Sequence, residues 1–296
     1  MSRPSHARVW IAGARPRTLV AAVVPVAVGA GAAVGGGPSD VEWWRALAAL
    51  LVATSLQIGV NFANDYSDGV RGTDDERRVG PTRLVGSGLA QPAVVRRAAL
   101  ISFAVAGAAG LGLAAVVGWE LLVVGAACLI AGWTYTGGPR PYGYLGLGEV
   151  FVFVFFGLVA TVGTTYVLTE AVSGLVVGCA VSVGLWATAL LVANNLRDIP
   201  GDIAAGKRTL AVRIGDAATR QAYTAMIVGS YLVAVGSSFG GRAAAAALVG
   251  APLAVAPIRD VGRGARGPDL IGVLAATGRL ALVSGLAMAL GLAVTG

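Results

Sequence analysis

The stretch WWRALAALLVATSLQIGVNFANDYSDGVRGTDD, residues 43–75, begins as an apolar run and ends as a cluster of amides and acids. The apolar part, residues 43–63, has about the 20 residues that a helix needs to cross a bilayer. Carboxylates are very costly in hydrocarbon, so the acids that follow are expected at the membrane edge, facing protein or water. The stretch therefore predicts a membrane helix that carries a polar site to the bilayer surface.

A second stretch of the same character, NNLRDIPGDIAAGKR, occupies residues 194–208 and also follows a long apolar run. Magnesium prefers oxygen ligands and commonly combines one or two carboxylates with the phosphates of a ligand. Two facing clusters of carboxylates therefore indicate a magnesium site for a diphosphate. An isolated cluster at a helix end often only caps the helix. Two clusters at corresponding membrane edges favour the functional interpretation.

The composition is that of an integral membrane protein. Of the 296 residues 56% are hydrophobic and only 12% are charged, which lies outside the balance of a soluble domain. The 44 glycines indicate close packing between helices. Cys128 and Cys179 lie in apolar runs and are expected to be packing residues. A zinc enzyme is disfavoured, since the only histidine is His6.

Hydropathy predicts an all-α integral membrane fold in a single domain, residues 1–296. About nine transmembrane helices are expected in one bundle, with cytoplasmic polar loops capping a central cavity. The helices are centred in the stretches 18–35, 43–63, 93–117, 120–136, 147–168, 172–194, 218–237, 243–258 and 270–293.

The basic residues predict the orientation in the membrane. Of the 22 lysines and arginines, only Arg45 and Arg242 fall on the side opposite to the N-terminus in this arrangement. Cytoplasmic loops carry an excess of basic residues, so the N-terminus and both acid-rich segments are expected in the cytoplasm and the C-terminus outside. Membrane topology thus explains the net charge of +7, and no nucleic-acid partner is predicted.

In the first cluster, Gln57, Asn61 and Asp65 are spaced by four residues, and Asp68 follows three later. On one continuing helix they form a single polar stripe, which must face the bundle interior or a water-filled cavity. The candidates are Asp65 and Asp68 for a cation, Asn61 and Asn64 for neutral contacts, and Asp74 or Asp75 in the following loop.

The second cluster repeats this spacing with Asn194, Asp198 and Asp202. Pro200 and Gly201 stand between the two acids and are expected to end or bend the helix there. Asn195 and Arg197 lie beside the stripe, and Lys207, Arg208 and Arg213 follow it as cations that suit the remaining charge of a diphosphate.

A third polar segment, WTYTGGPRPYGYLGLGE, covers residues 133–149. Its glycines and prolines are explained by a tight turn. Glu149 begins an apolar run, so its carboxyl is expected to face protein or water, with Arg140 as a candidate partner. Near the N-terminus, Arg15 stands at the start of the first apolar run. Its presence there is explained equally well by the positive-inside rule and by binding of a ligand carboxylate.

At these motifs the chain resembles the UbiA superfamily of intramembrane prenyltransferases over essentially its whole length. The segments NDYSDGVRGTD, YTGGPRPYGYLGLGE and NNLRDIPGDIAAGKRTLAVRIG look like the branch that prenylates 1,4-dihydroxy-2-naphthoate in the menaquinone pathway. Two positions depart from the superfamily pattern. Gly72 replaces a third acid of the first motif, with the next acids at Asp74 and Asp75, and Pro200–Gly201 stand between the acids of the second.

The resemblance implies an activity and roles for these residues. Magnesium held by Asp65, Asp68, Asp198 and Asp202 binds a polyprenyl diphosphate, and an electron-rich dihydroxynaphthoate attacks the allylic carbon with loss of carbon dioxide and pyrophosphate. The product is of the demethylmenaquinol type, and the lipid bilayer holds the isoprenoid chain. Further substrate contacts are expected from Asn61, Asn64, Asp74, Asn194, Asn195, Arg197, Lys207 and Arg208. Arg15 or Arg140 is a candidate for the acceptor carboxylate, and Tyr66, Tyr135 and Tyr142 either shield the carbocation or anchor the chain at the interface.

Two alternatives remain. A prenyltransferase of the same superfamily can use another acceptor: a hydroxybenzoate, a homogentisate, a porphyrin-derived ring or a lipid alcohol. A transporter can use paired acids to bind a coupling ion, but transporters place such groups near the membrane midplane, whereas these acids lie toward one face.

Overall fold

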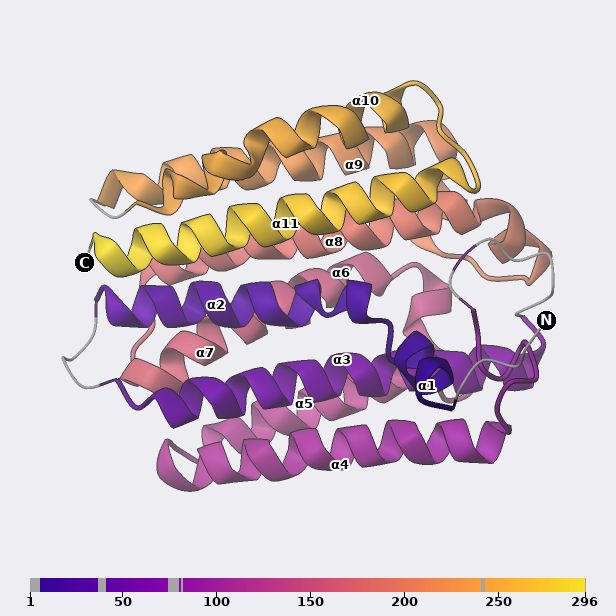
Figure 1. Cartoon of the computed structure of the whole chain (residues 1–296), viewed down its shortest axis with the longest axis horizontal. Helices are drawn as coiled ribbons and strands as arrows, with labels where there is room; N and C mark the ends of the chain where they lie inside the picture. Colours follow the sequence, from indigo (N-terminus) through magenta and orange to yellow (C-terminus); the bar gives the residue numbers. More distant parts are fainter. Residues whose placement is uncertain (1–5, 37–40, 74–79, 81, 241–242, 296) are drawn as a thin grey trace.

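The computed structural model describes residues 6–36, 41–73, 80, 82–240 and 243–295. Within these ranges the chain forms helices and connecting segments, with no β-strand. The long helices lie side by side along one direction, and the connections gather at the two ends of the bundle (Figure 1). The all-α prediction is confirmed.

The chain order of the elements follows the predicted apolar stretches closely. The elements are α1 (His6–Ala14), η1 (Pro16–Thr18), α2 (Val20–Val34), α3 (Trp43–Arg71), α4 (Pro92–Val116), α5 (Glu120–Thr134), η2 (Tyr142–Leu145), α6 (Gly148–Val152), the π-helix η3 (Phe153–Val159), α7 (Ala160–Thr169), α8 (Gly174–Ala204), α9 (Leu210–Ser237), η4 (Ser238–Gly240), η5 (Ala244–Ala254), α10 (Val255–Gly262) and α11 (Asp269–Val294).

Fewer helices than predicted qualify as membrane spans by their length and hydropathy. Among the described residues, six helical segments are long and apolar enough to cross a bilayer, and a seventh is gained if the bent pair 7–18 and 20–34 counts as one span. The expected count of nine is not confirmed. Helix α5 has only 15 residues, and the first half of α9 carries Arg213, Asp216 and Arg220.

Helix α3 continues past its apolar part and carries the predicted polar stripe. It runs unbroken for 29 residues to Arg71, and Gln57, Asn61, Asp65 and Asp68 are all buried. Gly72 ends it with a φ of +67°. The N–H of Gly72 donates to Gly69 O and that of Thr73 to Asp68 O, a Schellman closure that favours glycine at this position.

Helix α8 also continues where the sequence predicts a break. It runs for 31 residues to Ala204, with Pro200 inside it. Asp198 and Asp202 therefore lie on one helix, one turn apart. Of the two outcomes expected at Pro200 and Gly201, an end of the helix is excluded, and a bend stays a prediction. Proline lacks the main-chain donor that would reach the carbonyl of Leu196, four residues earlier.

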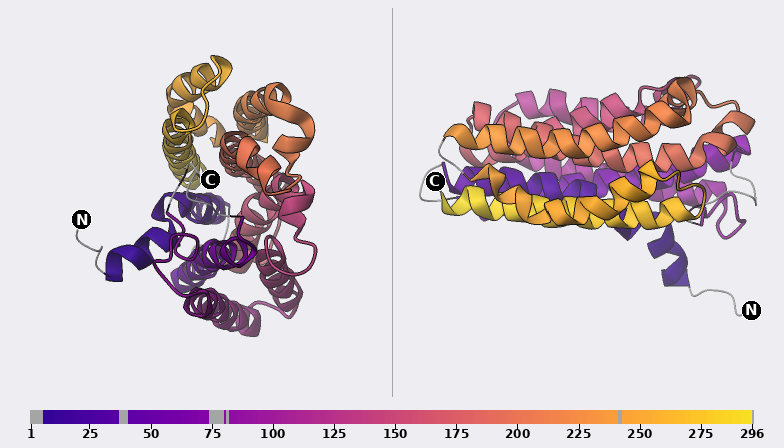
Figure 2. Two further views of the ribbon diagram at one scale, coloured as in Figure 1. Left: turned by 90° about the vertical axis from the view of Figure 1, so that its right-hand side faces the viewer. Right: turned by 90° about the horizontal axis from the view of Figure 1, so that it is seen from above.

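The N-terminal helix departs from the bundle direction. The chain bends by 50° between residues 7–18 and 20–34, and α1 projects sideways from the other helices (Figure 2). Arg15 takes the left-handed conformation at this bend, with a φ of 54°. Trp10 of α1 packs edge-on against Phe62 of α3, with 5.7 Å between the ring centroids, which fixes the bend against the end of α3.

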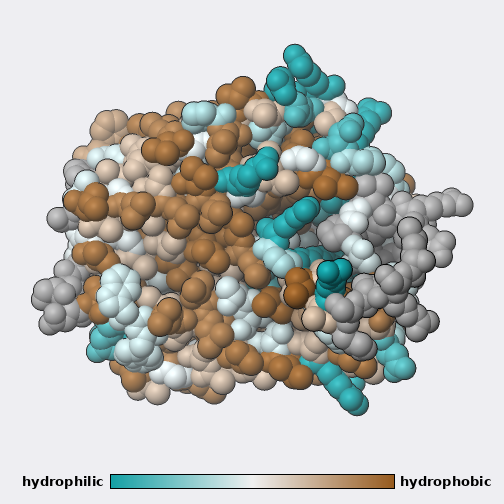
Figure 3. Space-filling view, in the orientation of Figure 1, coloured by the Kyte–Doolittle hydropathy of each residue, from teal (hydrophilic) through white to brown (hydrophobic). Residues whose placement is uncertain are grey.

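Polar residues gather at one end of the bundle. In Figure 3 the hydrophilic side chains concentrate at the end where α3 and α8 terminate, while apolar side chains cover most of the rest of the visible face. Both acid-rich motifs therefore lie at the same end. A multi-pass membrane protein with its polar groups toward one face is the arrangement that the hydropathy predicts.

Glycine allows the helices of this bundle to approach closely. A Cβ on Gly31 of α2 would lie 2.2 Å from Ala289 O of α11, and one on Gly157 of η3 would lie 2.4 Å from Gly184 Cα of α8. Contacts this short leave no room for a methyl group. The small residues thus set the distances between α2 and α11 and between η3 and α8.

We expect Gly31→Ala to destabilise the protein, because the new methyl group would force α2 away from the main chain of α11. Overpacking of this kind costs about 1–3 kcal/mol. Gly272→Ala on α11 is the matched control, since a Cβ there meets nothing within 4 Å, and alanine favours helix over glycine. Thermal unfolding in detergent measures both variants. An unchanged midpoint for Gly31→Ala would show that α2 and α11 can separate freely.

Candidate active site

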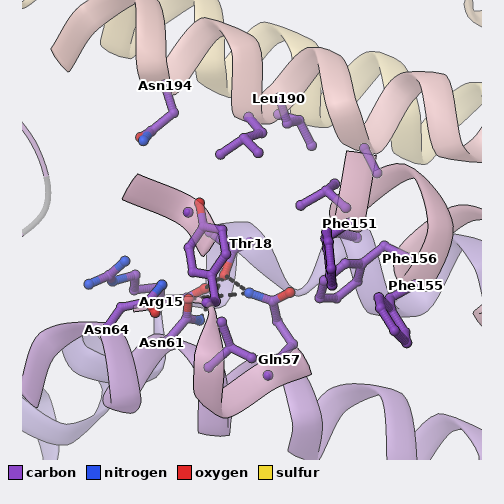
Figure 4. A pocket seen from close by; sticks show the side chains of 18 of the residues that line it. Arg15, Thr18, Gln57, Asn61, Asn64, Phe151, Phe155, Phe156, Leu190 and Asn194 are labelled. Carbon is purple, nitrogen blue, oxygen red and sulfur yellow. Dashed lines mark hydrogen bonds between the residues drawn. The ribbon is translucent and has the colours of Figure 1, made fainter. Parts of the chain in front are cut away.

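A cavity of about 1580 Å³ opens inside the bundle, between the two acid-rich motifs. It exceeds the roughly 300–1,000 Å³ of ordinary small-molecule pockets. Figure 4 shows its two kinds of wall: polar groups from η1 and α3 on one side, and aromatic rings on the other. The labelled residues are Arg15, Thr18, Gln57, Asn61, Asn64, Phe151, Phe155, Phe156, Leu190 and Asn194. Such a cavity suits a large ligand with a polar head and an apolar body.

The aromatic wall comes from one face of the segment α6–η3–α7. Phe151, Phe155 and Phe156 line the cavity together with Val159 and Ala160. Phe155 follows Phe151 by four residues and so lies on the same face, and the wider i→i+5 turn of the π-helix η3 keeps Phe156 near that face. Tyr142 stacks on Phe151, with 3.9 Å between the ring centroids. The wall is apolar over most of its length.

Two amides of the α3 stripe tie the N-terminal bend to α3. Asn61 Nδ2 donates to Ala14 O and to Thr18 Oγ1, each at 2.9 Å. Gln57 Nε2 donates to Asn61 Oδ1 at 3.2 Å and to Thr18 Oγ1 at 3.3 Å. The stripe therefore holds η1 and Arg15 at the cavity rim.

Asp68 receives donors from three separate segments. Arg83 Nη2 lies 3.3 Å from its Oδ2 and Lys207 Nζ lies 3.1 Å from its Oδ1, and the Tyr144 hydroxyl donates to Oδ1. The carboxylate is 4% exposed as a side chain and lines the cavity. Asp68 is thus the point at which three loops meet.

Tyr144 was not singled out from the sequence, although it connects both motifs. Its ring lies 5.3 Å from Arg71 Cζ and 4.7 Å from Lys207 Nζ, and its carbonyl accepts from Arg208 N at 3.0 Å. Burial and the neighbouring Asp68 raise the pKa of Tyr144 above its usual value, so the phenol stays a donor. The glycines and prolines around Tyr144 already explained the segment as a tight turn, so the sequence did not indicate a role for it.

The second motif is built around an internal ion pair. Arg197 donates to both oxygens of Asp198 at 2.7 Å, and its side chain is only 1% exposed. Arg197 also donates to Asn194 Oδ1 at 2.8 Å. Asp202, one turn further, accepts from Thr209 Oγ1 at 3.1 Å. Asn194, Arg197, Asp198 and Asp202 all line the cavity.

Glu149 pairs with the second motif and not with Arg140. Asn195 Nδ2 donates to Glu149 Oε1 at 2.9 Å, and Glu149 is 4% exposed. Arg140 is exposed and does not line the cavity, so the expected partnership is wrong. Glu149 therefore joins the start of α6 to α8.

Asp65 lies outside the cavity that the other predicted acids share. Its carboxylate is fully buried and accepts from the main-chain N–H groups of Leu84 and Val85, at 2.7 and 3.0 Å. It does not line the cavity. The helical spacing placed Asp65 on the same broad stripe as Asn61, but the segment after α3 folds back and covers it.

The other candidates divide into two sets. Arg15, Asn64, Tyr135, Asn195 and Lys207 line the cavity, whereas Tyr66 and Arg208 do not. Tyr66 packs on the α3–α4 side beneath Arg96, and Arg208 is exposed. Asp74 and Asp75 lie outside the described residues. Asn64 Oδ1 accepts from Thr136 Oγ1 at 2.7 Å.

Three arginines that membrane topology alone explained in the sequence also line the cavity. Arg17 lies in η1, Arg83 is carried by the segment between α3 and α4, and Arg279 lies ten residues inside α11, not in a loop. The sequence alone could not distinguish a role of these arginines in the cavity from the general excess of basic residues on the cytoplasmic side.

The carboxylates of the cavity can form a Mg²⁺ site only together with oxygen ligands from a bound substrate. In the described ranges no group of three or more acidic, histidine or cysteine side chains is close enough to hold a metal ion. Carboxylate oxygens are nevertheless the donors that Mg²⁺ prefers, and Asp68, Asp198 and Asp202 share one cavity. A site of one or two carboxylates completed by ligand phosphates matches these residues.

Comparison with known proteins gives consistent matches. A sequence profile of the UbiA prenyltransferase family matches residues 22–269. The chain is 50% identical to 1,4-dihydroxy-2-naphthoate octaprenyltransferase of Mycobacterium leprae over 287 residues, which cover 97% of each chain. It is 37% identical to the protein of that name in Escherichia coli, over 76% of this chain and 75% of the relative.

Solved structures share the fold at low sequence identity. A UbiA homolog from Aeropyrum pernix K1 superposes with a TM-score of 0.67 at 16% identity, over 94% of this chain and 97% of its own. A UbiA homolog from Archaeoglobus fulgidus, bound to DMAPP and Mg2+, gives 0.65 at 17% identity, over 97% and 98%. The bundle described above is therefore the fold of these proteins.

We expect Arg197→Met to destabilise the protein, because it leaves the Asp198 carboxylate without its bidentate partner. Removing one member of a buried pair costs about 3–5 kcal/mol, and the double variant with Asp198→Asn should recover part of that loss. Arg97→Met, at an exposed position, is the control. Thermal unfolding is the measurement, and equal midpoints for the single and double variants would contradict a coupled pair.

Proposed function

The chain belongs to the UbiA prenyltransferase family, and we propose that it transfers a polyprenyl group from a polyprenyl diphosphate to 1,4-dihydroxy-2-naphthoate. The observation that carries this proposal is the 50% identity, over 97% of both chains, to a relative named 1,4-dihydroxy-2-naphthoate octaprenyltransferase. The cavity, with an acidic and basic end and a long apolar wall, supports it independently.

The polar end suits the head of the donor. Asp68, Asp198 and Asp202 would hold Mg²⁺ together with the diphosphate oxygens, and the metal when bound supplies charge neutralisation for the leaving pyrophosphate. Lys207 lies beside Asp68 and adds a cation to the same place. The phenol of Tyr144 keeps Asp68 and Lys207 together. The isoprenoid chain then follows the apolar wall.

The transfer exchanges a carboxylate for a prenyl group. The allylic carbon–oxygen bond breaks and its electron pair leaves with pyrophosphate. A new carbon–carbon bond forms between the allylic carbon and the electron-rich ring. The ring loses its carboxylate as carbon dioxide, and the electron pair of that bond returns to the ring, giving a demethylmenaquinol. Tyr135 and Tyr142, at the polar end of the aromatic wall, present ring faces suited to an allylic cation.

Arg15 is the better candidate for the acceptor carboxylate. It lines the cavity at the bend between α1 and α2, where Asn61 and Thr18 hold the main chain in place. Its guanidinium has the planar fork that suits a carboxylate. The exposed Arg140 is dropped from this role.

The distribution of basic residues supports an orientation in the cell membrane with the N-terminus and active-site segments in the cytoplasm and the C-terminus outside. With the polar end in the cytoplasm, a water-soluble naphthoate can reach the site directly from the cytoplasm. The released pyrophosphate can leave by the same side. The membrane supplies the donor and takes up the product.

The acceptor is tested by competition. Purified protein with Mg²⁺ and farnesyl diphosphate should consume 1,4-dihydroxy-2-naphthoate and release carbon dioxide and pyrophosphate in equal amounts. Hydroxybenzoate and homogentisate, supplied at the same concentration, should give less than about a hundredth of that rate, because they do not fill the same site. Turnover of hydroxybenzoate without turnover of the naphthoate would assign a different acceptor. Uptake into vesicles without a covalent product would indicate a transporter.

The acids are tested by removing one charge at a time. Asp68→Asn and Asp202→Asn should each lower kcat by at least about 100-fold, because the diphosphate loses a metal carboxylate, and chelation of Mg²⁺ by EDTA should abolish turnover. Asp260→Asn, on the exposed part of α10, should retain normal activity. The thermal midpoint of each variant is measured as well, so that a loss of turnover can be told apart from a loss of folded protein. Near-normal turnover of Asp68→Asn at ordinary Mg²⁺ would remove Asp68 from the site.

A further inference from the structure

The cavity reaches the surface of the bundle beside two arginines that the proposed chemistry does not use. Arg17 of η1 and Arg279 of α11 both line the cavity, and both are exposed. Because η1 and α11 are in contact, the two arginines belong to the same side of the cavity. Neither side chain has a hydrogen-bond or ion-pair partner among the described residues. The described part of the fold therefore leaves these two positive charges without a counter-charge.

Arg279 lies within a helix that is long and apolar enough to cross the bilayer. Helix α11 has 26 residues, and it begins at the polar end of the bundle, opposite to the C-terminus (Figure 1). At 1.5 Å per residue, Arg279 is about 15 Å from the start of α11, and the whole helix is about 9 Å longer than a hydrocarbon layer of about 30 Å. Its Cα therefore lies about 6–15 Å below the membrane surface. A cation at such a depth is costly and indicates a bound partner.

The exposed face of α11 changes from cationic to apolar along the helix. Side chains lean toward the N-terminus of a helix, so the guanidinium of Arg279 extends toward the polar end, where the lipid head groups lie. Val283, Leu286 and Leu290 follow Arg279 on the same face at spacings of four, three and four, and they are 37%, 42% and 67% exposed. These three residues form the apolar stripe of α11. A cation followed by an apolar stripe matches an anionic head group followed by an acyl chain.

We propose that an anionic phospholipid binds at this edge of the cavity, with its phosphate on Arg17 and Arg279 and an acyl chain along the apolar stripe of α11. Basic pockets between membrane helices on the cytoplasmic side bind anionic head groups. A guanidinium has the planar fork that pairs with two phosphate oxygens. A zwitterionic lipid brings its own cation close to the arginines, which favours a head group with a net negative charge. Binding of this lipid needs neither prenyl donor nor acceptor, so it is independent of the proposed reaction.

Two other roles for these arginines predict different results. Arginines that serve only the positive-inside rule add charge to one side of the membrane, and any exposed arginine on that side would then affect lipid binding equally. Arginines that bind a substrate anion would change the KM for that substrate and leave lipid binding unaltered. A phospholipid site instead predicts lipid binding that depends on these two positions and on the head group.

Native mass spectrometry of the purified protein, with phosphatidylglycerol or phosphatidylcholine added to the detergent, measures the fraction of molecules that keep a bound lipid. The unaltered protein should retain phosphatidylglycerol in preference to phosphatidylcholine. Arg17→Gln and Arg279→Gln should each weaken the retention of phosphatidylglycerol about fivefold, the effect of one basic residue near a head group. Arg279→Lys should weaken it less, because lysine keeps the charge without the fork.

Arg97→Gln, exposed on α4, is the matched control, since it removes the same charge from another helix and should leave lipid retention unaltered. An equal loss in Arg97→Gln, or full retention in the double variant Arg17→Gln/Arg279→Gln, would overturn the proposal. Glycerol 3-phosphate carries the phosphate without the acyl chains and should not displace the lipid at equal concentration. Displacement by glycerol 3-phosphate would show that the apolar stripe contributes nothing and that the ligand is a free phosphate.

A second measurement follows the stability of the folded protein. Phosphatidylglycerol should raise the thermal midpoint of the unaltered protein, because a ligand of the folded state stabilises it, and should raise that of the double variant less. A KM for farnesyl diphosphate or for 1,4-dihydroxy-2-naphthoate that rises in the double variant, with lipid retention unaltered, would assign the arginines to a substrate and overturn the lipid site. Failure to prenylate the naphthoate would refute the proposed function alone, since neither lipid measurement depends on turnover.

Discussion

The carboxylate of Asp68 is the interaction on which the polar end of the cavity depends. It stands near the last turn of α3 and receives Arg83 from the segment after that helix, Tyr144 from the turn before α6, and Lys207 from the segment after α8. These three segments are far apart in the sequence. Because one buried carboxylate binds a donor from each, loops that have no apolar core of their own are fixed relative to one another.

This arrangement also explains how an apolar bundle holds so many charges. Several charged groups at the polar end have a partner that is part of the fold: Arg197 holds Asp198, Asn195 holds Glu149, and main-chain N–H groups hold Asp65. The cost of burying a charge is thereby offset before any ligand arrives. The carboxylate oxygens of Asp202 keep fewer protein donors, with Thr209 the one hydrogen-bond partner found among the described residues, which leaves it well placed for an incoming cation.

The sequence predicted the features that follow from regular periodicity. Spacings of four and three residues placed Asn61 and Asp68 on one buried stripe, and hydropathy located the helices. It failed where a contact depends on how a loop folds back. Asp65 has the spacing of a ligand, yet the main chain of residues 84–85 covers it. Tyr144 lies in a turn, where no helical or strand periodicity indicates which way a side chain faces. The local sequence therefore did not indicate that it contacts both acid-rich motifs. Pro200 and Gly201 predicted an end or a bend of the helix, and the helix continues through both to Ala204.

The lengths of α3 and α8 explain why the acids stand where they do. Helices of 29 and 31 residues extend about 44 and 46 Å at 1.5 Å per residue, whereas the hydrocarbon of a bilayer is about 30 Å thick. The surplus of roughly ten residues carries Asp68 on one helix and Asp198 and Asp202 on the other. Nearer the first residues of these helices, the side chains that line the cavity are apolar, with Val52 and Ala53 on α3 and Ala187 and Leu190 on α8. One continuous pair of helices therefore offers apolar surface at the depth of a lipid tail and carboxylates at the depth of its head group, so the position of the charged end relative to the bilayer follows from helix length alone.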